Sequence, residues 1–207
     1  RWLRDRIGLS RRKEAYTRTQ FLDPLLHDLG WHFIPEESLP EAKVTRKRPD
    51  YCLYMDEADQ QRAAQQTDPV EVFRPAVTVL ESKKVGHSLD MVSDDETPGW
   101  FPSQQIQDYL RNARDATGKR FFDWAILSNG NEWRLYCEQA SGNACFVFHL
   151  ADGDAFCSLE DFRLFVGLFR PQAFDQNEEG RCLLDEIREQ SLTLQADLES
   201  NLRKRVF

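Results

Sequence analysis

Apolar and polar residues follow two different spacings along the chain, and each spacing predicts one kind of element. Between residues 13 and 29 the apolar positions recur every three or four residues, which is the spacing of one helix face, and Gly30 suits the C-terminal cap. Pro24 interrupts this helix and indicates a kink or the start of a second helix. The same spacing predicts three more helices: Gln104 to Ala113 with Ser103 as cap, Glu160 to Phe169, and a long amphipathic one from Glu179 onward.

Short runs rich in β-branched and aromatic residues predict strands. The residues 129–131, Asn-Gly-Asn, favour the positive φ angles of a tight turn, so the strands beside them are expected to form an antiparallel hairpin. Residues 56–69 are polar and Gln-rich and are expected to form an exposed connection, and 86–102 reads as a loop. The predicted strands are 49–55, 76–80, 122–128, 132–137 and 144–150. Strands and helices interleaved in this way predict an α/β fold with a mixed central sheet and a long C-terminal helix.

The composition is that of one globular domain with an appendage. The chain has 207 residues, 41% of them hydrophobic, and a net charge of −8. No run approaches the roughly 18 apolar residues that span a bilayer, so we expect a cytoplasmic protein without a membrane partner. The five cysteines are widely spaced and include no C-x-x-C pair, which excludes an evident disulfide framework or zinc cage.

Net acidity argues against a nucleic-acid partner, but the charge is divided unevenly. Residues 1–50 hold 11 basic and 8 acidic residues, whereas residues 51–207 hold 16 and 27. Clusters of positive charge in the first part suit the phosphate backbone of DNA, although a single cluster is more often a solvated face. If the chain binds DNA, we expect contacts from Arg11, Arg12, Lys13, Arg46, Lys47, Arg48 and Lys84.

The residues that point to chemistry are Pro49-Asp50, at the head of one predicted strand, and Glu81-Ser82-Lys83, at the end of the next. Hydrolysis of a phosphodiester requires a divalent cation, a positioned water and positive charge beside the phosphate. Asp50 and Glu81 are suitable Mg²⁺ ligands, and Ser82 can add its backbone carbonyl. Lys83 lies two residues after Glu81 and so shares its face of the strand.

The pattern is short, and ordinary strand-end charges are the alternative interpretation for Asp50 and Glu81. A second E-x-K, Glu41 to Lys43, lies in a polar loop after Pro40 and lacks a strand to carry it. Glu81 instead ends the run AVTVL. The context therefore favours Glu81.

Together these residues resemble the PD-(D/E)xK nuclease superfamily, and more narrowly the N-terminal nuclease domain of type I restriction motor subunits and of methyltransferase-fused (type IIG-like) restriction enzymes. The resemblance runs through most of the chain, and its core residues are intact, but the stretch between Asp50 and Glu81 is long and implies an inserted hairpin. The matching segments are EAYTRTQFLDPLLHDLGW, RPDYCLY, VTVLESKK, QQIQDYLRNA and WAILSNGNEWRLY.

The resemblance implies roles for three further residues. The family's N-terminal glutamate near the metal site maps onto Glu14, and its Q-x-x-x-Y signature maps onto Gln105 and Tyr109. The alternatives are that Glu14 pairs with Arg18, four residues on, and that Tyr109 belongs to the core. The implied fold is the restriction-endonuclease-like core in residues 1–170, followed by a helical extension in 171–207.

The implied function is Mg²⁺-dependent hydrolysis of double-stranded DNA in a restriction-modification system, with Mn²⁺ as a substitute cofactor. Asp50, Glu81, Lys83, Glu14, Gln105 and Tyr109 would form the catalytic set. The chain starts without Met and stops within a helix, so we expect a segment of a longer protein with a downstream methyltransferase or motor domain. Double-strand cutting would call for transient pairing of two copies. The alternatives are a non-catalytic DNA-clamping module of the same fold, or a repair or recombination nuclease.

Overall fold

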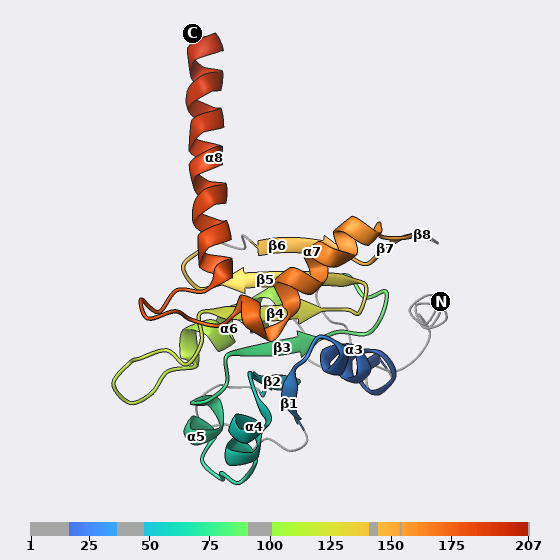
Figure 1. The fold of residues 1–207 in the computed structure, drawn as a ribbon, viewed down its shortest axis with the longest axis vertical. Helices are drawn as coiled ribbons and strands as arrows, with labels where there is room; N and C mark the ends of the chain where they lie inside the picture. Colours follow the sequence, from blue (N-terminus) through green and yellow to red (C-terminus); the bar gives the residue numbers. More distant parts are fainter. Residues whose placement is uncertain (1–16, 37–47, 91–100, 141–144, 154, 207) are drawn as a thin grey trace.

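A six-stranded mixed sheet forms the centre of the protein, seen in a computed structural model that describes residues 17–36, 48–90, 101–140, 145–153 and 155–206 (Figure 1). The strands follow one another across the sheet in chain order. Neighbours are antiparallel except β3 and β4, which are parallel and joined by a segment that contains a helix. The strands are β1 (His32–Pro35), β2 (Tyr51–Tyr54), β3 (Thr78–Ser82), β4 (Trp124–Ser128), β5 (Glu132–Cys137) and β6 (Cys145–His149). The predicted α/β fold with a mixed sheet is confirmed; the restriction-endonuclease-like core remains a prediction.

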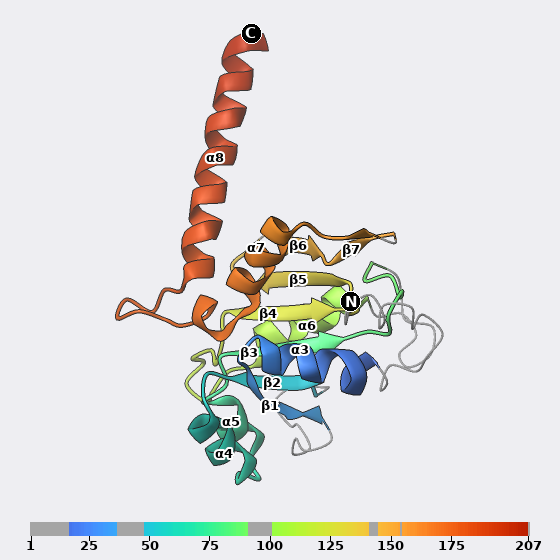
Figure 2. The ribbon, with the colours of Figure 1, turned by 45° about the vertical axis from the view of Figure 1, so that its right-hand side comes forward.

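Helices cover both faces of this sheet (Figure 2). On one face α6 (Pro102–Asn112) packs against β4 and β5, and its Ile106 and Leu110 belong to the buried cluster on this face. On the other face lie the helix before β1 and α7 (Leu159–Phe169), whose Phe165 ring meets that of Trp133 edge-on at 5.2 Å. Burial of a large apolar side chain contributes about 1.5–3 kcal/mol, so the two apolar layers hold the sheet between them.

The helix before β1 changes from π to α type just before Pro24, while its backbone stays helical. A π-helical turn, η1 (Arg18–Leu22), passes directly into α3 (Asp23–Asp28), because Leu22 and Asp23 keep helical backbone angles, and Pro24 lies in the first turn of α3. Gly30 ends the helix at φ +90°. The predicted residues 13–16 lie outside the described residues.

The connection between β2 and β3 is exposed over most of residues 56–69, as expected, but it is helical, which corrects the expected inserted hairpin. It contains α4 (Glu57–Ala64) and α5 (Pro69–Phe73). The side chains of Asp56 and Asp68 cap these helices by accepting hydrogen bonds from Asp59 N and Val70 N. The Gln-rich composition that predicted an exposed connection is also favourable for a helix once these caps are in place.

The cap of helix α6 differs from the one predicted from the sequence, whereas the hairpin that follows agrees with the prediction. The cap of α6 is Phe101 and not the expected Ser103, because the side chain of Gln104 accepts from Phe101 N and Pro102 occupies the first turn. The hairpin of β4 and β5 is confirmed, with Gly130 at φ +88°.

The chain after α7 begins against the sheet and then leaves it. Phe174, Cys182 and Leu184 belong to the same buried cluster as Trp31, so residues beyond the predicted boundary at 170 contribute to the core. The 3₁₀ turn η3 (Pro171–Ala173) precedes α8 (Leu183–Val206), which projects away from the sheet (Figure 1). A small hairpin, β7 (Ala151–Asp152) and β8 (Ala155–Phe156), was not predicted.

None of the helices in the described parts of the chain combines the length and apolar character that crossing a bilayer requires.

Candidate functional site

Asp50 lies at the start of β2, next to the end of β3. Tyr51 pairs with Leu80, so Asp50 and Glu81 each stand one residue beyond the same strand pair. Asp50 is 6% exposed, and its Oδ2 accepts hydrogen bonds from the backbone N and the Oγ of Ser82, each over 2.6 Å. A buried carboxylate needs such donors, because loss of water would otherwise disfavour its charge.

Glu81 and Lys83 are brought together by the alternation of β3. The Nζ of Lys83 donates to Glu81 Oε1 over 2.7 Å, and the side chains are only 12% and 4% exposed. The backbone N of Lys83 donates to Ser128 O, which continues the pairing with β4 and fixes the residue beyond the strand. Since the pair is nearly buried, it is screened by solvent far less than a surface ion pair.

Helix α6 supplies Gln105 and Tyr109, one helical turn apart. Gln105 Nε2 donates to the hydroxyl of Tyr109 over 2.9 Å, and Gln105 Oε1 lies 3.4 Å from Lys83 Nζ. The single phenolic proton of Tyr109 is shared between the carbonyl of Arg48 at 2.8 Å and Glu81 Oε2 at 3.1 Å. The helix thus joins the beginning of β2 to the end of β3.

The environment of Tyr109 keeps it protonated. Burial raises the pKa of Tyr109 well above its ordinary value of 10, and the nearby charge of Glu81 raises it further. Tyr109 is therefore a hydrogen-bond donor that orients Glu81, and it belongs to the core as well, at 2% exposure. The two interpretations of this residue from the sequence are compatible.

Arg18 and the hydroxyl of Ser82 belong to the site and were not predicted in these roles. The NH1 of Arg18 lies 3.1 Å from Asp50 Oδ1, and its guanidinium stands 5.5 Å from the centre of the Tyr51 ring. The sequence offered Arg18 only as a partner of Glu14. The available signal in the sequence was the spacing of Arg18, which places it on the same helix face as Leu22, Leu25 and Leu29.

The donor set fits a Mg²⁺ ion. Asp50 and Glu81 offer hard carboxylate oxygens at one end of β3, and Mg²⁺ is usually held by one or two carboxylates with water and phosphate oxygens. Within the described residues, no three His, Cys, Asp or Glu side chains gather as a metal-binding group. The residues that could hold a cation here are Asp50 and Glu81, with the backbone carbonyl of Ser82 as the predicted third oxygen.

The other predicted site residues fall into two groups. Arg48 is half-buried and contributes its carbonyl to Tyr109, while Lys84 is exposed directly after Lys83. Both are within two residues of the catalytic candidates in sequence. The remaining ones, Glu14, Arg11, Arg12, Lys13, Arg46 and Lys47, lie outside the described residues.

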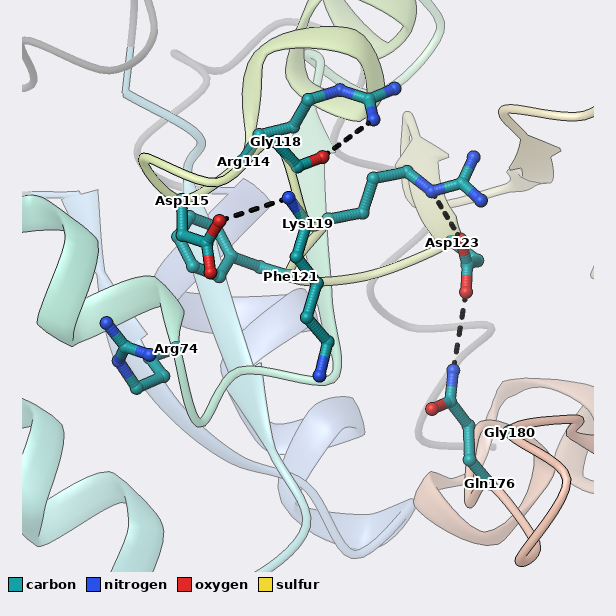
Figure 3. A pocket seen from close by; sticks show the side chains of 10 residues that line it. Arg74, Arg114, Asp115, Gly118, Lys119, Phe121, Asp123, Gln176 and Gly180 are labelled. Carbon is teal, nitrogen blue, oxygen red and sulfur yellow. Dashed lines mark hydrogen bonds and ion pairs between the residues drawn. The ribbon is translucent and has the colours of Figure 1, made fainter.

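A pocket of about 600 Å³ lies at the opposite end of α6, where Arg114 follows the helix (Figure 3). Basic side chains line it, but most are paired: Arg114 with Glu138 at 3.1 Å, Arg120 with Asp123 at 2.9 Å, and Arg74 with Glu71 at 2.9 Å. The positive charge is thus largely compensated, and the pocket is separate from the carboxylates of Asp50 and Glu81.

Comparison of the chain with protein-family models, with curated proteins and with solved structures found no match.

Proposed function

We propose that this chain is a Mg²⁺-dependent endonuclease domain that hydrolyses phosphodiester bonds of double-stranded DNA in a restriction-modification system. The observation that carries the proposal is that Asp50 is bonded to Ser82, the residue between Glu81 and Lys83, while Gln105 and Tyr109 of α6 contact the Glu81–Lys83 ion pair. Two carboxylates beside an ammonium group are what metal-assisted attack on a phosphate requires.

The carboxylates of Asp50 and Glu81, with the carbonyl of Ser82, would hold the cation. Bound Mg²⁺ would supply Lewis-acid activation of water and neutralise charge on the phosphate. The two hydrogen bonds from Ser82 hold Asp50 in place beforehand, and Tyr109 does the same for Glu81. Such preorganisation reduces the rearrangement that the reaction needs.

Lys83 would act on the phosphate or on the attacking water. Its ammonium is held by Glu81 and lies near Gln105, so its position is defined before substrate arrives. As water attacks phosphorus and the bond to the leaving oxygen breaks, negative charge grows on the phosphate oxygens, and a fixed cation stabilises that charge. Gln105 would help to position the ammonium.

The proposed partners are double-stranded DNA and a further domain of the same protein. Arg48 and Lys84 flank the site and suit contacts with the DNA backbone, to which the other basic residues of the N-terminal part of the sequence would add. Such contacts carry no sequence information, so recognition would belong to a further part of the protein, such as a methyltransferase or motor domain. The proposed location is the cytoplasm, where host restriction acts.

The test is cleavage of plasmid DNA by the purified chain with Mg²⁺ or Mn²⁺, with EDTA as the metal-free arm. We expect Asp50→Asn and Lys83→Ala to abolish cleavage without loss of the folded circular dichroism spectrum. Lys119→Ala removes an exposed lysine far from the site and should cleave as the original chain does. Full activity of Lys83→Ala would reject the assignment.

The original chain and its Asp50→Asn variant also distinguish the alternative functions. A divalent cation that binds at Asp50 and Glu81 should raise the melting temperature of the original chain and not that of Asp50→Asn. DNA binding with no metal-dependent shift and no cleavage would indicate a clamping module. Preference for branched over linear duplexes would indicate a repair or recombination nuclease.

A further inference from the structure

Arg18 places a positive charge directly on the carboxylate of Asp50. The NH1–Oδ1 distance is 3.1 Å, and the Arg18 side chain is 11% exposed. Glu36 Oε2 lies 3.5 Å from the same NH1 but is more exposed, at 38%. The guanidinium thus lies beside Asp50, although Arg18 belongs to η1, which precedes both β1 and β2 in the chain.

The hydrogen bonds of Asp50 show which of its oxygens is open to a cation. Each carboxylate oxygen has about two lone-pair directions. Oδ2 accepts twice from Ser82, whereas Oδ1 accepts once, from Arg18. A cation on Asp50 would therefore bind Oδ1, the oxygen that Arg18 already contacts.

Each carboxylate of the site is compensated by its own cation, Asp50 by Arg18 and Glu81 by Lys83. Like charges this close in a nearly buried site repel strongly, so Arg18 opposes binding of a divalent ion to Oδ1. A DNA phosphate brings negative charge to both cations and relieves the repulsion. Binding of metal and binding of DNA then favour each other reciprocally.

We infer that Arg18 makes metal binding depend on DNA: it lowers the affinity of the empty site for a divalent cation and restores that affinity when a phosphate is present. The inference rests on the proposed function, because it takes Asp50 as a metal ligand. Arg18 is a positioning and charge-compensating residue here, since it acts through Asp50. Such coupling would restrain metal-dependent cleavage until the substrate is in place.

A purely structural role for Arg18 makes a different prediction. Arg134 provides the matched control, because its guanidinium is equally buried and binds Asp90 through two bonds of 2.6 and 2.8 Å. Arg134 lies on β5 and takes no part in the candidate site. Loss of either arginine should lower stability, but only loss of Arg18 should change metal binding.

The experiment is calorimetric titration of the full 207-residue chain with Ca²⁺, alone and with a short DNA duplex. We expect Arg18→Met and Arg18→Gln to bind Ca²⁺ at least about threefold tighter without DNA, and the enhancement by DNA to fall by a similar factor. Arg18→Gln keeps a neutral donor for Oδ1 and serves if Arg18→Met does not fold. Arg18→Lys should behave as the original chain, and Arg134→Met should change only the melting temperature.

Two results would overturn the inference, and they are distinguishable. Unchanged or weaker Ca²⁺ binding by both neutral variants, with Asp50→Asn binding less than the original chain, would reject the role of Arg18 and leave the metal site standing. Equal titration curves for the original chain and Asp50→Asn would reject the metal site and, with it, the proposed function.

Discussion

Asp50 and Ser82 are joined by two hydrogen bonds of 2.6 Å, one from the backbone N–H of Ser82 and one from its hydroxyl. The two residues are 32 positions apart in sequence, and Ser82 separates Glu81 from Lys83. The pair therefore ties the carboxylate at the start of β2 to the strand that carries the other two catalytic candidates.

Ser82→Ala removes one of these two bonds and keeps the backbone one. Because the acceptor is a buried carboxylate, we expect a loss of about 1.5–3 kcal/mol in the free energy of unfolding, measured by urea titration. Cleavage should fall as Asp50 becomes less fixed. Ser88→Ala, at an exposed serine, is the control, and equal stability of the two variants would contradict the importance of this bond.

Tyr109→Phe removes the hydroxyl that bridges Glu81 and the carbonyl of Arg48. We expect a loss of about 1–3 kcal/mol in stability near pH 7 and slower cleavage, because Glu81 loses a donor. The pKa of Tyr109 is raised in the folded state, so its contribution is complete below the unfolded value of about 10 and is lost as the pH rises above it.

Urea titrations at several pH values check this sign. The stability difference between the original chain and Tyr109→Phe should shrink above about pH 10, where the unfolded tyrosine ionises first. A difference that grows with pH would contradict the assignment of the buried hydroxyl as a neutral donor.

Asp90→Asn tests an ion pair away from the site. The hydrogen bond from Arg134 holds the pKa of Asp90 below its ordinary value. Its stabilising contribution is therefore present above the unfolded value of about 3.9 and is lost as the pH falls through the lower folded value. The free energies of unfolding of Asp90→Asn and the original chain, measured by urea titration, should converge as the pH falls, and a difference that stays constant with pH would contradict this contribution of the ion pair.

Gly130→Ala should destabilise the protein more than Gly118→Ala. Both glycines have φ near +87°, as their values of +88° and +86° show, so each alanine carries a similar backbone cost of about 1–2 kcal/mol. A Cβ at Gly130 would also lie 3.3 Å from Phe21 and Val85, while one at Gly118 would have no atom within 4 Å. Equal melting temperatures of the two variants would show that the side chains of Phe21 and Val85 can move aside without loss of stability.

The sequence predicted the elements whose signals are local. The β4–β5 hairpin follows from Asn129-Gly130, and the irregular helix geometry before α3 adjoins Pro24, because turns and helix irregularities depend on a few neighbouring residues. The wrong predictions have a local cause too. Residues 57–64 and 69–73 are helical and do not form the expected hairpin, because Asp56 and Asp68 cap the two helices, and both capping residues are present in the sequence.

By itself, then, the sequence determined the strand-end positions of Asp50, Glu81 and Lys83, because their spacing around two strands is a property of the chain. Only the tertiary structure decided what each side chain contacts: Arg18 bonded to Asp50, and Tyr109 shared between Glu81 and Arg48. These contacts join segments 28 to 61 residues apart, and their geometry depends on how the helices pack on the sheet. Local spacing carries no information on such packing, which is why the charge compensation of the site became visible only in three dimensions.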